Sequence, residues 1–172
     1  MRFNPEIHHR KSIRLKGYDY SRNGAYFVTI CAWNRECIFG EIIDGKMNLS
    51  NIGLIINDIW PWLGEQYHFL HLLDYVIMPN HLHGLIVLDY CKGGSRTAPT
   101  EKSKPLGRLL GAFKTRSTKF INMSRQTSGA PVWQRNYYER IVRNEIEFNR
   151  IFEYIINNPA NWNDDENNPI NV

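Results

Sequence analysis

The stretch of residues 75–88 constrains the fold of this chain more than any other. It reads Tyr75-Val-Ile-Met-Pro-Asn-His-Leu-His-Gly-Leu-Ile-Val-Leu88, which is two β-rich apolar runs separated by a short polar break. Runs of this kind predict strands over residues 72–78 and 82–88, joined at Pro79 and Asn80. Because side chains alternate between the two faces of a strand, His81 and His83 are expected to point the same way.

These two histidines admit two interpretations. Two imidazoles on one face of a stiff strand can hold a single divalent metal ion. The alternative is that they are ordinary strand histidines, hydrogen-bonded and semi-buried for packing reasons. The remaining residues of the chain have to separate the two.

Composition places the chain among globular proteins of the cytoplasm. Its 172 residues suit a single domain, and 42% hydrophobic and 13% aromatic residues suffice for a core. We find neither an apolar run near the ~20 residues that cross a bilayer nor the apolar start of a signal peptide. Cys31, Cys37 and Cys91 never form a Cys-x-x-Cys pair, which favours reduced thiols over a zinc-thiolate site or a disulfide framework.

Basic residues are concentrated in two parts of the chain. Residues 92–125 hold nine Lys and Arg against one acid, although the net charge is only +4. Residues 1–22 hold six Lys and Arg against two acids. Basic charge beside aromatic residues indicates a polyanion partner such as nucleic acid, and the alternative is a solvated surface.

Local patterns give the order of the elements. They predict a strand over residues 25–33, a hairpin over 38–49, a helix over 50–67, the two strands above, a helix from 105 with a basic outer side, an extended stretch over 132–143, and a helix over 145–158. Asp44-Gly45 suits a two-residue hairpin turn, Ser50 suits an N-cap, and Pro61 predicts a kink or restart within its helix. This order predicts an α+β fold with helices packed on an antiparallel sheet.

The domain organisation follows from the same patterns. We expect a basic N-terminal arm over residues 1–24, one domain over residues 25–162 and a C-terminal tail over residues 163–172. Within the domain, residues 89–104 have the composition of a mobile loop.

The last predicted helix carries the second half of a candidate site. Its apolar stripe comprises Phe148, Ile151, Phe152, Ile155 and Ile156. Tyr154 lies outside this stripe, and Asn158, four residues later, lies on the same side as Tyr154. The alternative is a surface tyrosine beside a capping asparagine.

The two halves fit one chemistry. A phenolate can form a covalent intermediate with phosphorus if a Lewis acid polarises the phosphate. Two imidazoles and one amide oxygen, without a thiolate, suit Mg²⁺ or Mn²⁺, and Mn²⁺ is the more comfortable of the two with imidazole.

Four motifs give the chain a recognisable resemblance. They are Tyr26-Phe-Val-Thr, Met78-Pro-Asn-His-Leu-His-Gly84, Trp133-Gln-Arg-Asn-Tyr-Tyr-Glu139 with Arg143-Asn144, and Tyr154-Ile-Ile-Asn-Asn-Pro159. Together they resemble the single-tyrosine HUH transposases of the small insertion-sequence type, and among these the REP-associated tyrosine transposases. The resemblance runs from about residue 18 to residue 162. It implies a ferredoxin-like or RRM-like antiparallel sheet with helices packed on one face.

The resemblance also implies roles for individual residues. His81 and His83 would be metal ligands, Tyr154 the nucleophile, and Asn158 a third ligand at a position where related enzymes often carry Gln. Tyr137 and Tyr138 are rival nucleophiles, but Tyr154 is preferred because only it has the helical Asn partner.

The function expected from these observations is DNA transposition chemistry. The protein would cleave and rejoin single-stranded or hairpin DNA in the bacterial cytoplasm, on the nucleoid when bound, through a 5′-phosphotyrosine intermediate. It would act as a monomer or as a homodimer, without a membrane partner. The DNA would be held by Arg108, Lys114, Arg116, Lys119, Trp133, Arg135 and Tyr138. The alternatives are a non-catalytic hairpin-binding relative of a transposase and a metal-dependent nuclease that uses water.

Overall fold

A computed structural model describes residue 19, residues 22–90 and residues 104–171 of the protein. The predicted basic arm over residues 1–24 and the predicted mobile loop over residues 89–104 therefore fall largely outside the described residues. Within the described part of the chain, no helix combines the length and the apolar character that crossing a bilayer would require.

The elements follow the predicted order. They are β1 (Gly24–Cys31), β2 (Gly40–Ile43), β3 (Lys46–Leu49), α1 (Asn51–Gln66), β4 (Leu70–Ile77), β5 (His81–Leu88), α2 (Leu106–Ser124), β6 (Tyr138–Val142) and α3 (Glu145–Asn157). Short 3-10 helices over Trp33–Arg35, Pro159–Asp164 and Pro169–Asn171 complete the set.

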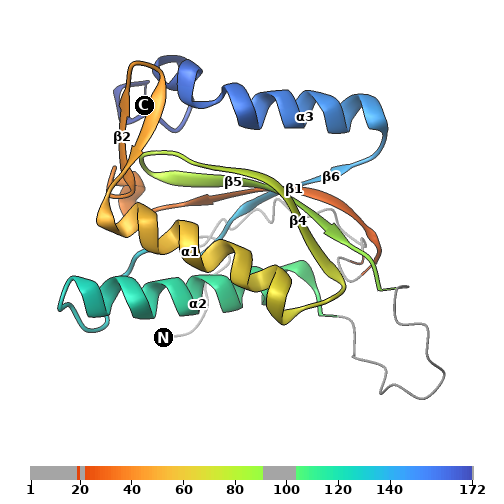
Figure 1. Ribbon diagram of the computed structural model, residues 1–172, viewed down its shortest axis with the longest axis horizontal. Coiled ribbons are helices and arrows are strands. Elements are labelled where there is room, and N and C mark those ends of the chain that lie inside the picture. Colours follow the sequence, from red (N-terminus) through yellow and green to blue (C-terminus); the bar gives the residue numbers. More distant parts are fainter. Residues whose placement is uncertain (1–18, 20–21, 91–103, 172) are drawn as a thin grey trace, which may run out of the picture.

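Four strands form one antiparallel sheet in the order β4-β5-β1-β6. With α1 after β1 and α2 after β5, this is the ferredoxin-like arrangement, so the predicted α+β class and sheet are confirmed. The β2–β3 hairpin is a separate two-stranded sheet at one end of the molecule (Figure 1). Helices α1 and α2 cover one face of the large sheet, and α3 runs across the opposite face (Figure 1).

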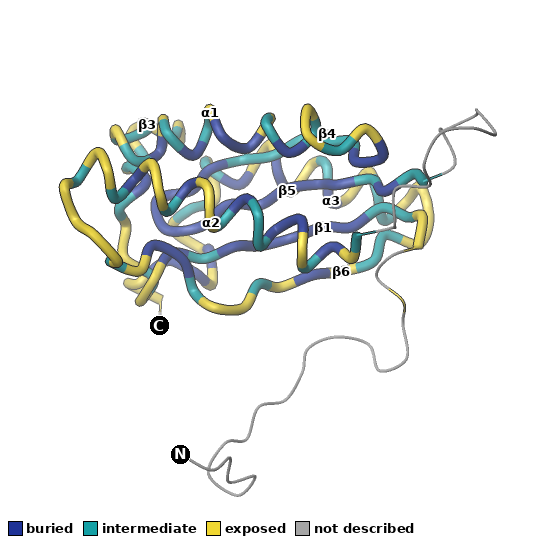
Figure 2. Tube along the Cα trace, turned by 90° about the horizontal axis from the view of Figure 1, so that it is seen from below, coloured by how far each residue is buried: buried dark blue, intermediate teal, exposed yellow. Residues whose placement is uncertain are grey.

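Helix α3 packs on the opposite face because β1 and β5 carry apolar side chains on both faces. Tyr26, Val28 and Ile86 belong to the large core under α1 and α2. Phe27 and Leu85, one residue out of phase, pack on the buried residues of α3 in a second, smaller core. Figure 2 shows both central strands buried along most of their length. The sheet is therefore a middle layer, and the expectation of helices on one face describes α1 and α2 only.

Several local predictions are confirmed by backbone geometry. Asp44 and Gly45 both have positive φ (49° and 71°), as a type I′ hairpin turn requires. The Ser50 hydroxyl accepts hydrogen bonds from the backbone N–H groups of Ile52 and Gly53, which caps α1. Helix α1 continues through Pro61 without a restart. Pro61 lies at an exposed position of the helix, where its ring does not enter the core.

Gly84, which follows the two histidines, is required by close packing. A Cβ atom at this position would lie 2.5 Å from Cζ2 of Trp60. Trp60 is fully buried between α1 and the sheet. The glycine therefore lets α1 approach β5 on the face opposite the histidines.

Trp133 corrects one sequence expectation. It was expected to stack on DNA bases, but it is 7% exposed and belongs to the large core. Its indole N–H donates to the Ser117 hydroxyl (2.9 Å), and its ring packs on Phe39 and Phe113. The residue lies in an irregular segment that folds back beneath the sheet, so its exposure could not be judged from its immediate neighbours.

This position predicts a structural role for Trp133. Replacing Trp133 with Ala is expected to lower the free energy of unfolding by about 3–5 kcal/mol, because it removes a large core side chain. Trp33→Ala is the matched control, since Trp33 is 43% exposed, and should cost about 1 kcal/mol or less. Urea unfolding measures both. Equal losses in the two variants would contradict the core assignment.

Candidate functional site

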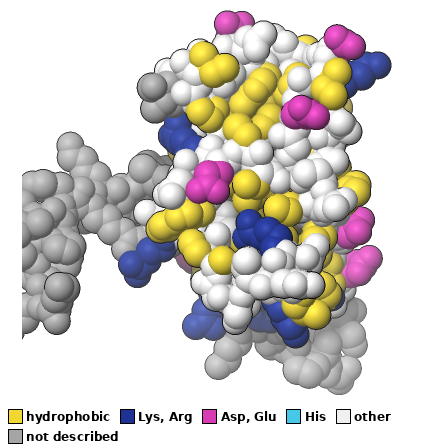
Figure 3. Space-filling view, turned by 90° about the vertical axis from the view of Figure 1, so that its left-hand side faces the viewer, with side chains coloured by type: hydrophobic (Ala, Val, Ile, Leu, Met, Phe, Trp, Pro, Cys, Tyr) yellow, Lys and Arg dark blue, Asp and Glu magenta, His cyan; other side chains and the backbone are white. Residues whose placement is uncertain are grey.

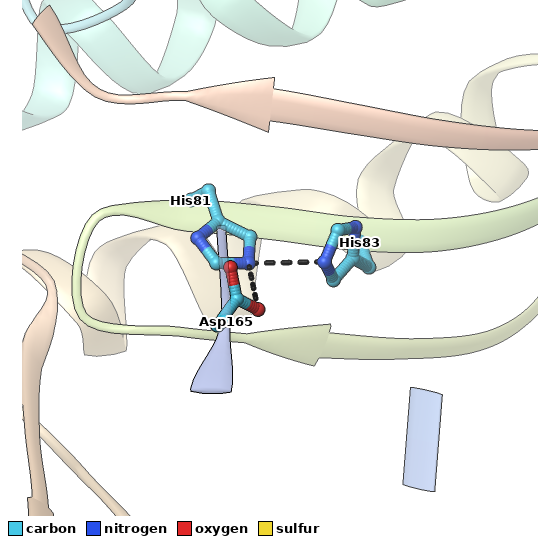
Figure 4. Close-up of side chains that lie close together, drawn as sticks. All are labelled: His81, His83 and Asp165. Carbon is cyan, nitrogen blue, oxygen red and sulfur yellow. Dashed lines mark hydrogen bonds and ion pairs between the residues drawn. The ribbon is translucent and has the colours of Figure 1, made fainter. Parts of the chain in front are cut away.

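His81 and His83 lie side by side on β5, on the sheet face covered by α3. Their Nε2 atoms are 3.0 Å apart, and both side chains are buried. Figure 4 shows the two rings turned toward each other from the same strand. The shared face expected from strand alternation is therefore observed.

Each ring is oriented by a hydrogen bond at its other nitrogen. The Oδ1 atom of Asn80 lies 2.8 Å from Nδ1 of His81, while its Nδ2 group donates to the backbone carbonyls of Arg35 and Asn167. Asn80 thus accepts the Nδ1–H of His81, so the neutral His81 ring keeps its lone pair on Nε2. Thr29 Oγ1 lies 2.8 Å from Nδ1 of His83 and can do the same there. Such partners are typical of metal-binding histidines.

Asp165 brings a carboxylate to the same point. Its Oδ2 atom is 3.8 Å from Nε2 of His81, and the ligand atoms of His81, His83 and Asp165 all lie within 4.8 Å of one another. Its Oδ1 atom accepts hydrogen bonds from the backbone and side-chain N–H groups of Asn167, which fixes the carboxylate. Asp165 lies in the stretch of residues 163–172 that was expected to be a tail.

Tyr154 and Asn158 reach the site from α3. The Tyr154 hydroxyl is 3.2 Å from Nε2 of His83, and its ring lies edge-on to Phe27 and His83. Asn158 follows one helical turn later and is buried, with no hydrogen-bond partner in the described structure for its Oδ1 atom. A buried amide oxygen without a partner is costly, and a bound cation would satisfy it.

The electrostatics of the site keep its two imidazoles neutral and its phenol protonated. Burial lowers the pKa of His81 to about 4, with Asp165 acting in the opposite direction, and burial together with His81 holds the pKa of His83 well below 6.5. Burial, reinforced by the charge of Asp165, raises the pKa of Tyr154, while a hydrogen bond from Asn158 lowers it. Two neutral imidazoles beside a carboxylate form an electron-rich cluster that suits a cation.

These shifts predict an acid-sensitive apo protein. With a folded pKa near 4 against 6.5 in the unfolded chain, His81 binds its proton less readily when folded. Its contribution to the free energy of unfolding, roughly 3 kcal/mol, is therefore present above pH 6.5 and is lost as the pH falls to about 4. Urea unfolding in chelator across this range should show the loss. His81→Gln should reduce it, whereas His68→Gln, at an exposed position, should not. The same slope in wild type and His81→Gln would contradict the assignment.

The donor set fits a divalent metal. The described residues offer two imidazole nitrogens, one carboxylate oxygen and one unpartnered amide oxygen, and no thiolate lies among them. A mixed set of nitrogen and oxygen donors suits Mn²⁺ better than Mg²⁺, which prefers oxygen ligands.

A cavity of about 590 Å³ opens beside Tyr154 and His83, between β6 and α3. Tyr137 and Tyr138 both line it, and so do Arg140 and Arg150. Tyr138 shares a sheet row with His83, because both pair with Thr29 on β1, and it is 48% exposed. Tyr138 therefore faces the cavity from the edge of the sheet, two strands away from the histidines.

The residues proposed from the sequence to bind DNA lie in different surroundings. Arg108, Arg116 and Lys119 are exposed on α2, which covers the face of the sheet opposite the cavity. The Arg116 guanidinium lies over the ring of Trp62. Arg135 is exposed in the segment before β6. On the end of the molecule seen in Figure 3, basic side chains form small groups among hydrophobic and acidic ones.

Lys114 differs from these residues because its amino group is hydrogen-bonded within the protein. Its amino group donates to the backbone carbonyls of Gln134 (2.9 Å) and Asn136 (2.8 Å). Burial lowers its pKa to about 8. Lys114 thereby ties α2 to the segment that lines the cavity.

Sequence reasoning missed three residues of the site. Thr29 and Asn80 stand within quoted motifs, and their hydrogen bonds to the histidines explain why polar residues occur at buried positions. Asp165 had only a weak signal, the acidic run of residues 164–166.

Comparison with known proteins gives one relative and one shared fold. No protein-family model matches the chain. An uncharacterized protein of Haemophilus influenzae is 38% identical over 175 residues, which cover 96% of each chain. Among solved structures, a REP-associated tyrosine transposase bound to a REP hairpin matches with a TM-score of 0.57 and 14% identity, over 89% of this chain and 74% of that one.

The first match is extensive enough to define a family, and the second defines a fold. The fold match agrees with the ferredoxin-like sheet. The chain belongs to the same family as the Haemophilus influenzae protein and has the fold of a REP-associated tyrosine transposase.

Proposed function

We propose that the protein is a metal-dependent DNA strand transferase that acts through a phosphotyrosine formed on Tyr154. The observation that carries the proposal is the position of the Tyr154 hydroxyl, 3.2 Å from Nε2 of His83, whose ring faces that of His81. A nucleophile and a candidate metal centre are thus in contact, although 71 residues separate Tyr154 from His83 in the chain. Packing alone does not require a phenol and two imidazoles to converge on one another.

The metal would be held by His81 and His83, with Asn158 as the ligand proposed from the sequence and Asp165 as an addition. Their donor atoms are buried, and the imidazoles are neutral near pH 7. A divalent ion bound there would act as a Lewis acid toward the phosphate oxygens. Its charge would also offset that of Asp165, which raises the pKa of the Tyr154 phenol.

The chain's own groups account for the exchange of bonds. The Tyr154 oxygen attacks a phosphodiester, forming the bond to phosphorus while the bond from phosphorus to the 3′-oxygen breaks. The phenol releases its proton to solvent, and the departing 3′-oxygen takes one up from solvent, so the products are a 5′-phosphotyrosine and a free 3′-hydroxyl. A 3′-hydroxyl of another strand reverses the step, so rejoining requires no ATP.

The substrate is proposed to be single-stranded or hairpin DNA. The solved transposase with the same fold is bound to a REP hairpin, which supports this class for the present chain. The cavity beside Tyr154 joins aromatic and Arg side chains, a combination that suits stacked bases and phosphates. The exposed Arg108, Arg116, Lys119 and Arg135 would add contacts to the backbone outside the cavity.

A single chain supplies every group named above. His81, His83, Tyr154 and Asp165 meet within one molecule. This supports a site completed in cis, and a homodimer is not needed to bring the nucleophile to the metal.

One experiment tests the proposal directly. The protein is incubated with a hairpin carrying a single-stranded flank and Mn²⁺, and a denaturing gel is examined for a covalent protein–DNA adduct. An adduct that disappears with chelator is expected. Cleavage without an adduct would favour a water-using nuclease, and hairpin binding without cleavage would favour a non-catalytic binding protein.

A further inference from the structure

Three polar side chains follow one another along α3 at intervals of one turn. They are Arg150, Tyr154 and Asn158, which occupy positions i, i+4 and i+8 and so share one side of the helix. Each step of four residues advances about 6 Å along the axis. Ile151 and Ile155 of the same helix are buried against the sheet. The row therefore passes from a proposed metal ligand, through the proposed nucleophile, to an arginine.

Arg150 and Tyr154 line the same cavity. Its lining also includes His83 and Arg140. A second hollow of about 360 Å³ is also lined by Arg140, Arg150 and Ile151, and it continues toward Asn144 at the start of α3. Because the two hollows share these three lining residues, they adjoin, and together they are called the path along α3 below.

The two arginines on this path differ in their ion-pair partners. Arg140 is held by Glu147, with its Nε and Nη2 atoms both 2.6 Å from the Glu147 Oε1 atom. Glu147 also accepts a hydrogen bond from the backbone N–H of Arg143. Arg150 is exposed, and among the described residues it has no ion pair. Its guanidinium is therefore available to an anion that enters the path.

DNA phosphate suits this position in charge and spacing. A guanidinium binds a phosphate through two parallel hydrogen bonds. An extended single strand spaces its phosphates more widely than the roughly 3.4 Å axial spacing of a duplex strand, which brings them nearer to the ~6 Å step along α3. A strand whose scissile phosphate lies at Tyr154 would therefore bring a neighbouring phosphate to Arg150.

We propose that Arg150 binds the phosphate next to the scissile phosphate, so that the single-stranded part of the substrate runs along α3 toward its first turn. The inference rests on the proposed function and deepens it. Arg150 is then a positioning residue, which fixes the register of the strand relative to Tyr154. Arg140, held by Glu147, forms the wall of the path.

The test neutralises one phosphate at a time. Hairpin substrates carry a single uncharged methylphosphonate at each phosphate flanking the cleavage site, and the rate of adduct formation with Mn²⁺ is measured. In wild type, one flanking position should lower the rate about ten- to a hundredfold, the worth of a charged hydrogen bond. Arg150→Gln should show a similar loss on unmodified DNA and no further loss at that position. The sensitive flank then gives the polarity of the strand.

Two further variants make the result specific. Arg108→Gln removes an exposed arginine from α2, on the opposite face of the sheet, and should weaken all substrates alike. Arg150→Lys keeps the charge without the two-pronged geometry and should fall between wild type and Arg150→Gln. Far-ultraviolet circular dichroism and thermal unfolding check that each variant is folded.

The outcomes separate this inference from the proposed function. If Arg150→Gln retains the wild-type sensitivity at every flanking phosphate, or weakens all substrates as Arg108→Gln does, Arg150 does not bind the neighbouring phosphate. If wild type forms no adduct with any substrate, the proposed function fails. The affinity for the same substrates is then measured on the Tyr154→Phe protein, with and without Arg150→Gln. A loss of affinity at one neutral phosphate that disappears with Arg150→Gln supports the contact, and the same loss in both proteins overturns it.

Discussion

Tyr154→Phe is expected to abolish the covalent protein–DNA adduct while leaving metal binding and DNA binding intact. The substitution removes one oxygen, which is the proposed nucleophile. The proposed ligands His81 and His83 are unchanged, so Mn²⁺ should bind as before. Tyr154 is 44% exposed, and its hydroxyl contacts His83 (3.2 Å) and Asn158, so the loss of stability should be about 1 kcal/mol.

Tyr138→Phe is the matched control for this result. Tyr138 lines the same cavity, is similarly exposed and stands next in line as a nucleophile. It lies two strands away from His83, so its loss should leave the adduct in place. Denaturing gels and calorimetric titration with Mn²⁺ measure the two properties. If Tyr154→Phe still forms an adduct, the nucleophile is Tyr138 or Tyr137. If Tyr154→Phe cleaves DNA without an adduct, water is favoured as the nucleophile.

The parts of the site that sequence periodicity could predict are those carried by single regular elements. Strand alternation places His81 beside His83, and helical spacing places Asn158 beside Tyr154, whatever the rest of the chain does. The contact between the two pairs depends on α3 crossing the sheet. Its placement had a signal in residues 26–30 of β1, where every position is buried, since a strand with two apolar faces needs cover on both.

The parts that could not be predicted depend on irregular segments. Asp165 reaches His81 through turns held by asparagine side chains, including the bonds from Asn167 to its carboxylate. Such turns have no period that a pattern could detect. Trp133 and Lys114 were assigned to DNA for their chemistry, but tertiary contacts with residues far away in the sequence occupy both.

His81→Ala is expected to abolish tight Mn²⁺ binding, and DNA cleavage with it. The change removes one of two Nε2 donors that lie 3.0 Å apart and leaves the buried carboxylate of Asp165 beside an empty space. Tyr154 keeps its hydroxyl, so any loss of cleavage has a different origin from that in Tyr154→Phe. His68→Ala, at an exposed histidine, is the control and should bind Mn²⁺ as wild type does.

Asp165→Asn then decides whether the carboxylate is a ligand. The substitution keeps the shape of the side chain and removes its charge. If Asp165 is a ligand, Mn²⁺ affinity should fall about tenfold or more, as for loss of a charged contact. The pKa of Tyr154 in the metal-free protein should fall as well, because the charge of Asp165 raises it. If Asp165→Asn lowers the pKa of Tyr154 but leaves Mn²⁺ affinity unchanged, Asp165 acts only through its electrostatic field. If His81→Ala binds Mn²⁺ as wild type does, the metal is not bound at β5.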